Sequence, residues 1–113
     1  MKALFVGIDK YPFEIEMEDN LNNYQSLVGG NIEVLSIKER DSRSIDIIFN
    51  EEGKLINLPL NRNIVFPDGY VEPIMGNIII VAANLNTGDF ESLTDEEINW
   101  YKNMFLDDYI FII

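Results

Sequence analysis

The side chains able to do chemistry in this chain are almost all carboxylates. The 113 residues include 20 Asp and Glu against 8 Lys and Arg, with no cysteine and no histidine. This composition excludes disulfides, thiolate nucleophiles, most zinc sites and the usual general base at neutral pH. No remaining set of residues forms a catalytic constellation, so we expect a protein that is not an enzyme and that holds no cofactor or metal.

One series of acids falls on a predicted turn and on the start of the helix after it. The series consists of Asp89, Glu91, Asp95, Glu96 and Glu97. It lacks the Asp-x-Asp-x-Asp-Gly spacing of a calcium loop. Thr94 and Glu97 instead match a capping box, and acids at a helix start suit the positive end of its dipole. Trp100 is predicted to point away from the inner helix face, so we expect it to anchor a protein partner beside these carboxylates.

Two further groups of polar residues allow alternative interpretations. Asp46, Glu51 and Glu52 could form a metal site or an acid–base pair, but a turn glycine follows and no histidine accompanies them. We therefore interpret them as exposed turn residues. Arg62 follows Pro59 on a predicted corner. It either clamps the turn at Glu51 and Glu52 by charge-assisted hydrogen bonds, which we favour, or contacts a partner.

Periodicity and turn residues predict the elements that carry these side chains. Apolar runs predict strands over residues 2–8, 13–18, 31–37, 45–49, 77–83 and 109–113, with short extended pieces at 55–58 and 90–93. The run at 77–83 is the most apolar and is predicted to be the central strand. Asp19 or Asn20 caps a first helix that Gly29 or Gly30 ends. The capping box starts a second helix.

The connections are predicted from charge, glycine and proline. Residues 38–43 are interpreted as a solvated charged loop, and Gly53 as a turn residue free to adopt positive φ. Pro59 disfavours a central strand, so residues 60–63 are expected to form a corner or the start of a short helix. The whole chain, residues 1–113, is then one α+β domain. We expect a mixed or antiparallel sheet of five to seven strands with two helices packed on it.

The distribution of charge restricts the class of partner. The formal net charge is −12, and residues 64–113 hold nine carboxylates with Lys102 as their single base. Such a surface repels nucleic-acid backbones and anionic lipid, so we expect neither nucleic-acid nor membrane binding. A protein with a basic surface remains as a partner, unless the charge only maintains solubility. The short apolar run at the N-terminus predicts no leader and no membrane span, which favours a cytoplasmic protein.

Three segments carry specific patterns: residues 27–33 (LVGGNIE), residues 50–55 (NEEGKL) with 58–62 (LPLNR), and residues 88–97 (GDFESLTDEE). Taken together, they resemble an uncharacterised domain family of phage, plasmid and conjugative-element proteins. The resemblance covers residues 1 to about 106 and brings no established activity. It implies a mobile genetic element as the setting and the cytoplasm of the host cell as the location.

The function predicted on this basis is binding of a host defence protein, of CRISPR or restriction type, that has a basic nucleic-acid-binding surface. The acidic C-terminal half would present carboxylates where phosphates normally lie, and would inhibit the host protein as a DNA mimic. One alternative is a ligand-binding or accessory enzymatic domain whose pocket the sequence does not reveal. Another is a structural or assembly protein, in which residues 109–113 pair with a second copy to form a homodimer.

Overall fold

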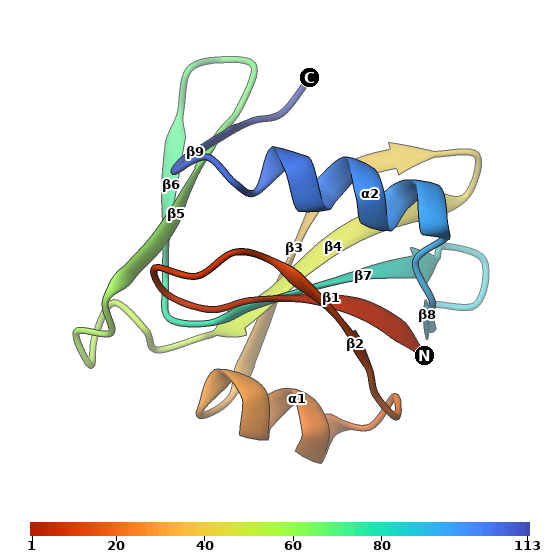
Figure 1. Cartoon of the computed structure of the whole chain (residues 1–113), viewed down its shortest axis with the longest axis horizontal. Helices are drawn as coiled ribbons and strands as arrows, with labels where there is room; N and C mark the ends of the chain where they lie inside the picture. Colours follow the sequence, from red (N-terminus) through yellow and green to blue (C-terminus); the bar gives the residue numbers. More distant parts are fainter.

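The structure is a computed structural model that describes all 113 residues as two helices and nine strands (Figure 1). The elements in chain order are β1 (Lys2–Val6), β2 (Phe13–Glu16), α1 (Leu21–Val28), β3 (Ile32–Arg40), β4 (Arg43–Asn50), β5 (Leu60–Val65), β6 (Val71–Met75), β7 (Ile78–Asn84), β8 (Phe90–Glu91), α2 (Asp95–Met104) and β9 (Tyr109–Phe111). The strands form one sheet of six and one sheet of three.

The six-stranded sheet is antiparallel throughout and has β7 near its centre. Its strand order is β2-β1-β7-β4-β3, and the short β8 pairs with β7 beyond the end of β1. A strand covered on both faces requires a continuous apolar run, and residues 78–83 of β7 are all buried. The prediction of a central strand at 77–83 is therefore confirmed.

The two helices cover opposite faces of this sheet (Figure 1). Side chains alternate between the faces along each strand, so neighbours such as Ile47 and Ile48 enter different cores. The larger core receives Ile98, Tyr101 and Phe105, which helical spacing places on one face of α2. The smaller core receives Tyr24 and Val28 of α1. Both helices are therefore held by burial of one apolar face.

The second sheet lies near the C-terminal end of α2 and consists of β6, β5 and β9 (Figure 1). Its middle strand β5 is antiparallel to β6 and parallel to β9. The predicted strand at the end of the chain is thus present, but it extends this second sheet and not the large one. Ile110 is fully buried, whereas Tyr109 and Phe111 are exposed. Pairing of this segment with a second copy stays a prediction.

Two predicted connections are wrong because strands run further than the sequence indicated. Residues 60–63 lie in β5, since Pro59 precedes the strand and removes no N–H from its ladder. The charged loop at 38–43 is a tight hairpin, because β3 continues to its end at position 40. Only Asp41 and Ser42 form the turn, with φ of 52° and 62°. Positive φ at both positions is the conformation of a two-residue type I′ turn.

A third correction concerns the segment that joins the two sheets. The extended piece predicted at 55–58 is absent, because residues 51–57 form turns. Asn57, with φ of 55°, adopts the left-handed conformation that was predicted for Gly53. Gly53 is needed for a different reason, since a Cβ there would lie 2.9 Å from the carbonyl oxygen of Met75. The glycine permits close approach of two backbones.

The predicted class of α+β domain is confirmed, with two helices and a six-stranded antiparallel sheet. The separate three-stranded sheet raises the strand count to nine, above the single sheet of five to seven strands that was expected. Neither helix has the length and apolar content that crossing a lipid bilayer requires.

Candidate functional site at the start of α2

α2 begins with the predicted capping box. Thr94 Oγ1 accepts a hydrogen bond from the Glu97 backbone N–H at 3.1 Å, and Glu97 Oε1 accepts one from the Thr94 N–H at 2.8 Å. Leu93 and Ile98, on either side, are both buried in the larger core. Together these contacts fix the direction in which the chain enters the helix. The first turn of α2 therefore has a defined position relative to the sheet.

Arg43, the first residue of β4, ties this turn of α2 to the sheet. Its guanidinium donates to both carboxylate oxygens of Glu97, with Nη2–Oε1 at 2.6 Å and Nε–Oε2 at 3.1 Å. It also donates to Glu91 and, at 3.0 Å, to the carbonyl oxygen of Ser92. Glu91 was predicted to contact a partner. The structure shows that it is already held in an internal ion pair.

Glu97 is ionised in this arrangement. Burial by itself raises the pKa of a carboxyl group, because the charged form loses hydration. The hydrogen bonds from Arg43 and from the Thr94 N–H outweigh burial, so the pKa of Glu97 lies below its ordinary value. The hydrogen bond to Glu97 in turn raises the pKa of Arg43. This carboxylate is therefore a fixed negative charge that supports the helix start.

The other predicted carboxylates of the series remain on the surface. Asp89 and Glu96 are exposed and form none of the ion pairs in the structure. Asp95 accepts a hydrogen bond from Lys2 Nζ at 3.1 Å, and this bond raises the pKa of Lys2. Both side chains of that pair are well exposed, so the pair is worth little.

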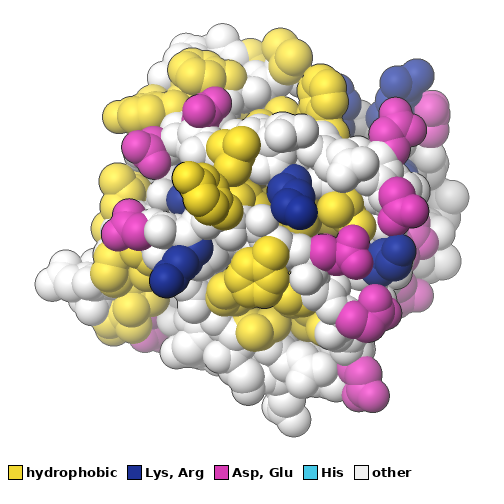
Figure 2. Space-filling model, in the orientation of Figure 1, with side chains coloured by type: hydrophobic (Ala, Val, Ile, Leu, Met, Phe, Trp, Pro, Cys, Tyr) yellow, Lys and Arg dark blue, Asp and Glu magenta, His cyan; other side chains and the backbone are white.

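Acids from β2 extend this surface. Glu14 and Glu16 lie opposite Leu4 and Lys2 in the sheet register, on the face that α2 covers, and their charges add to the effect of Asp95 on Lys2. We call the resulting surface the acidic edge, which comprises Glu14, Glu16, Asp89, Asp95 and Glu96. Figure 2 shows acidic side chains gathered along the right-hand margin, around the N-terminal end of α2. The acidic edge thus joins two segments that are distant in sequence.

Trp100 lies beside this edge. Its side chain is 63% exposed, which confirms that it points away from the inner face of α2. Residues four positions apart are neighbours on a helix surface, so Trp100 and Glu96 stand next to each other. The structure therefore brings together the tryptophan and the unpaired carboxylate that the sequence predicted as a partner-binding surface.

Arg62 has a different role from either of those predicted, and both interpretations are wrong. It is only 4% exposed, because β5 carries its side chain beneath the end of α2. Its Nε and Nη2 donate to the carbonyl oxygen of Phe105 at 3.0 and 2.7 Å. Other N–H groups donate to Asn61 Oδ1 at 2.7 Å and to the carbonyl oxygen of Lys10 at 3.1 Å. Arg62 therefore caps α2 from inside and is out of reach of a partner.

The three carboxylates that were considered as a metal site differ in burial. Asp46 is buried in β4 and accepts a hydrogen bond from Ser36 Oγ at 2.7 Å. Glu51 and Glu52 are exposed on the turn that follows the strand. The structure contains no group of three or more Asp and Glu side chains placed to hold a metal ion.

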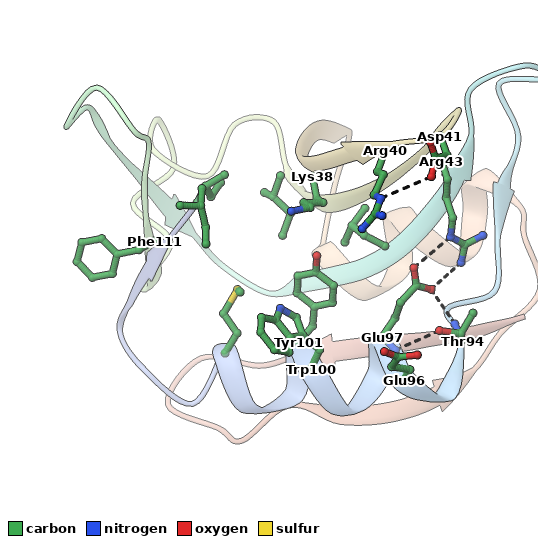
Figure 3. A pocket seen from close by; sticks show the side chains of 15 residues that line it. Lys38, Arg40, Asp41, Arg43, Thr94, Glu96, Glu97, Trp100, Tyr101 and Phe111 are labelled. Atoms are coloured by element: carbon green, nitrogen blue, oxygen red, sulfur yellow. Dashed lines mark hydrogen bonds and ion pairs between the residues drawn. The ribbon is translucent and has the colours of Figure 1, made fainter.

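A cleft of about 540 Å³ lies between α2, the β3–β4 hairpin and the C-terminal residues (Figure 3). Ile37 and Ile45 line it from the hairpin, Tyr101 and Met104 from α2, and Ile112 from the C-terminal segment. Small-molecule sites commonly have volumes of roughly 300–1,000 Å³ and a mostly apolar lining. The start of α2 therefore borders a hollow of the size and composition typical of a ligand site.

A β-bulge in β3 directs two consecutive side chains toward this cleft. The register of β3 against β4 shifts between Ser36 and Lys38, which interrupts the usual alternation of side chains. Ile37 enters the larger core, and both Ile37 and Lys38 line the cleft. In a regular strand these neighbours would point to opposite faces of the sheet. The bulge is thus what brings a lysine to the α2 side.

Three of the eight basic side chains of the protein line this cleft, together with the carboxylates of Asp41, Glu96 and Glu97. Arg43 is neutralised by its bonds to Glu97. Arg40 approaches Asp41 at 3.5 Å, but both side chains are more than four-fifths exposed and such pairs are weak. Lys38 forms no ion pair and lies across the cleft from the ring of Tyr101 (Figure 3). The uncompensated charge on this wall therefore belongs to Lys38.

The hydroxyl of Tyr101 also faces the cleft. The residue is only 6% exposed, yet its hydroxyl makes no hydrogen bond within the protein. The single fully buried side-chain oxygen without a partner is Ser44 Oγ, so the Tyr101 hydroxyl must reach the open space of the cleft. Figure 3 shows it pointing toward the hairpin. Burial, with the charge of Glu97, raises the pKa of Tyr101, which keeps its proton available for donation.

Lys38, Arg43 and Tyr101 were not among the predicted site residues. The first two were interpreted as part of a solvated loop. One signal was present for Arg43, because it precedes Ile45 by two positions and a strand of period two places both on the same face. The position of Lys38 depends on the bulge, for which the sequence carries no clear mark.

The fold and this site define a small acidic α+β domain with a solvent-open cleft beside an acidic helix start. Residues 1–106 match the family described as a domain of unknown function, DUF3846, and the chain belongs to that family. No curated protein and no solved structure gives a significant match.

Two of the three segments that carried the family resemblance, residues 27–33 and residues 50–55, meet at the end of α1. Gly29 ends α1 with φ of 80°, as predicted. Asn50 Nδ2 donates to the carbonyl oxygen of Val28 at 3.2 Å, and a Cβ on Gly30 would lie 2.9 Å from that nitrogen. The second segment thus satisfies the end of the helix that the first segment terminates. The third segment forms the start of α2.

Proposed function

We propose that this domain is a protein-binding module that contacts a partner through the acidic edge and Trp100. The observation that carries the proposal is the placement of an exposed tryptophan beside an unpaired carboxylate, Glu96, four positions away on α2. Tryptophan is enriched at binding hot spots, where a large apolar surface becomes buried. Carboxylates around it would select a basic partner and speed the encounter.

The partner class that we propose is a host defence protein with a basic, nucleic-acid-binding surface. The domain would inhibit it by placing carboxylates where phosphates bind. The support is the overall charge of −12 together with an edge of five carboxylates, of which two form ion pairs: Asp95 with Lys2, and Glu16 with the N-terminal ammonium group. The setting of a mobile element and a host cytoplasm is supported by the sequence resemblance alone.

The structure dictates which carboxylates the test should change. Glu91 and Glu97 must be kept, because they hold Arg43 and the helix start. Asp89, Asp95 and Glu96 can be reversed to lysine together, since each is exposed and none lies in the core. The matched control reverses Glu33, Glu51 and Glu52, which are equally exposed, make no ion pair and produce the same change in net charge.

The experiment captures proteins from host lysate on the immobilised domain and elutes them with rising salt. We expect one or a few proteins that elute at moderate salt, because screening weakens a polyanionic contact. The reversal of Asp89, Asp95 and Glu96 should abolish their capture, and the control reversal should not. Binding rates measured with the recovered protein should fall mainly in the association phase. Equal capture by both reversed variants would show that the acidic edge is not the contact surface.

A further inference from the structure

We propose that the cleft beside α2 binds a small amphipathic anion, with a carboxylate or phosphate head and an aliphatic or aromatic body. This site borders the partner contact proposed above, because Trp100 and Glu96 also line the cleft, but the proposal does not depend on that contact. It lies between the hairpin wall that carries Lys38 and the α2 wall that carries Tyr101, and its volume suits a small organic molecule.

The polar groups that remain available inside the cleft are donors. Tyr101 as a residue is only 6% exposed, but its hydroxyl has no partner within the protein and points across the cleft (Figure 3). The ammonium group of Lys38 faces it without an ion pair, and Arg40 stands at the rim. A hydroxyl and an ammonium group that converge from opposite walls match a ligand head with acceptor atoms and negative charge.

The carboxylates that line the cleft do not cancel this preference. Glu97 has both oxygens on Arg43. Asp41 pairs with Arg40 on the hairpin turn. Glu96 has no cationic partner, but it lies on the first turn of α2, at the opposite corner of the cleft from Lys38 (Figure 3). The end of the cleft near Lys38 and Tyr101 is therefore the end that accepts an anion.

The body of the ligand would lie against apolar side chains. The cleft continues from Tyr101 along α2 to Met104, and Ile37 and Ile112 form its other sides. Methionine adapts its shape to irregular apolar groups, so this part of the lining suits bodies of different shape. The head is thus fixed by two donors, whereas the body is held by burial of apolar surface.

The net charge of the protein opposes binding of an anion. With a net charge of −12, the domain attracts cations and repels anions at long range. Nonspecific binding would therefore favour a cationic ligand over its anionic counterpart. A preference for the anion can only come from local groups in the cleft.

The test uses octanoate, octanamide and octylamine, which share one aliphatic chain and differ in the charge of the head. Trp100 is the only tryptophan and lines the cleft, so its fluorescence reports occupancy directly. We expect saturable binding of octanoate that is at least about tenfold tighter than that of octylamine, because a hydrogen bond to a charged group contributes roughly 1.5–3 kcal/mol. Octanamide should fall between them.

Two variants test whether Lys38 and Tyr101 are the donors that bind the head group of the ligand. Lys38→Met removes the charge but keeps most of the unbranched side chain, and it should weaken octanoate binding by about tenfold, to the level of octanamide. Tyr101→Phe removes only the hydroxyl and should weaken octanoate by roughly fivefold. The matched control is Lys102→Met, on the same helix but outside the cleft, which should leave octanoate binding unchanged.

Three results would overturn the proposal: no saturable binding of any probe, tighter binding of octylamine than of octanoate, or equal effects of Lys38→Met and Lys102→Met. The reversal of Asp89, Asp95 and Glu96 distinguishes this site from the partner surface. It should abolish capture of a partner and leave octanoate bound at least as tightly, because it adds positive charge near the cleft. Failure of one proposal therefore leaves the other open to its own test.

Discussion

The two ends of α2 are joined to the rest of the molecule by opposite kinds of interaction. At its start, side chains bond to side chains: Thr94 and Glu97 form the capping box, and Arg43 crosses from the sheet to Glu97. All three remain in contact with solvent. At its end, the buried guanidinium of Arg62 donates hydrogen bonds to the carbonyl oxygen of Phe105. A cation at this position also stabilises the negative end of the helix dipole.

This difference separates the part of α2 that supports the fold from the part that is available for function. The interior end is fixed from inside the protein, since Arg62 and Phe105 are both buried. The open end borders the cleft and the acidic edge, and it presents Trp100 to solvent. Motions or contacts at the open end therefore need not disturb the core, whereas a change at the interior end should affect the whole domain.

The largest effect is predicted for the interior end. Arg62→Met should lower the free energy of unfolding by on the order of 3 kcal/mol, because it leaves the carbonyl oxygens of Phe105 and Lys10 and the side chain of Asn61 without their donor. Urea unfolding measures this change. Arg40→Met is the matched control, with its side chain 82% exposed, and should have almost no effect. Similar stability of the two variants would remove the distinction between the two ends.

A smaller effect is predicted for the residue that joins the open end to the sheet. Arg43→Met should cost about 1–2 kcal/mol, because it breaks partly exposed bonds to Glu91, Glu97 and the carbonyl of Ser92. The measurement is again urea unfolding, accompanied by hydrogen exchange. Protection should fall first in the opening turn of α2. A uniform loss of protection across the large sheet would mean that the open end is as integral to the core as the interior end.

The sequence predicted the open end of α2 well because its signals are local. The capping box involves residues three positions apart, and the exposure of Trp100 follows from the helical period relative to Ile98. The central strand was also predictable, because a strand covered on both faces must be continuously apolar. In each case the information lies within one element.

The interior end and the cleft were not predictable, because they depend on contacts between distant segments. Arg62 meets Phe105 across 43 positions, and Arg43 meets Glu97 across 54. Nothing in the neighbourhood of either arginine indicates its partner. Arg62 was therefore predicted to lie on the surface, whereas it is buried and bonds to the carbonyl oxygens of Phe105 and Lys10. Lys38 lines the cleft because of a β-bulge in β3. The sequence around Lys38 has no clear signal that predicts this bulge.

The capping box itself gives the next prediction. Thr94→Ala should destabilise the domain by about 1 kcal/mol, since the Glu97 N–H loses its acceptor at the exposed start of the helix. Thermal or urea unfolding measures it, and Thr94→Ser, which keeps the hydroxyl, is the control. The effect should be well below that of Arg62→Met. A loss as large as that one would show that the helix start is anchored as deeply as its end.

The smallest effect is a dependence on pH that only the open end should show. The pKa of Glu97 is lower in the folded protein than its ordinary value of 4.5, because the bonds from Arg43 and the Thr94 N–H outweigh burial. Folding therefore favours the ionised carboxylate. The resulting stabilisation is complete above about pH 4.5, and it is lost as the pH falls through the lower folded pKa.

Removal of Arg43 should take away most of this dependence, because burial is then opposed only by the hydrogen bond from the Thr94 N–H. The difference in unfolding free energy between the wild type and Arg43→Met should be constant from pH 7 to about 5 and should shrink below pH 4.5. Comparison with Arg62→Met sharpens the contrast. Arg62 bonds to backbone carbonyls and an amide, which do not titrate, and the charges of Asp9 and Asp108 act on it without forming an ion pair, so its difference from the wild type should change less over the same range. If both differences shrink together in acid, then general unfolding, and not the carboxylate at the start of α2, controls the response to pH.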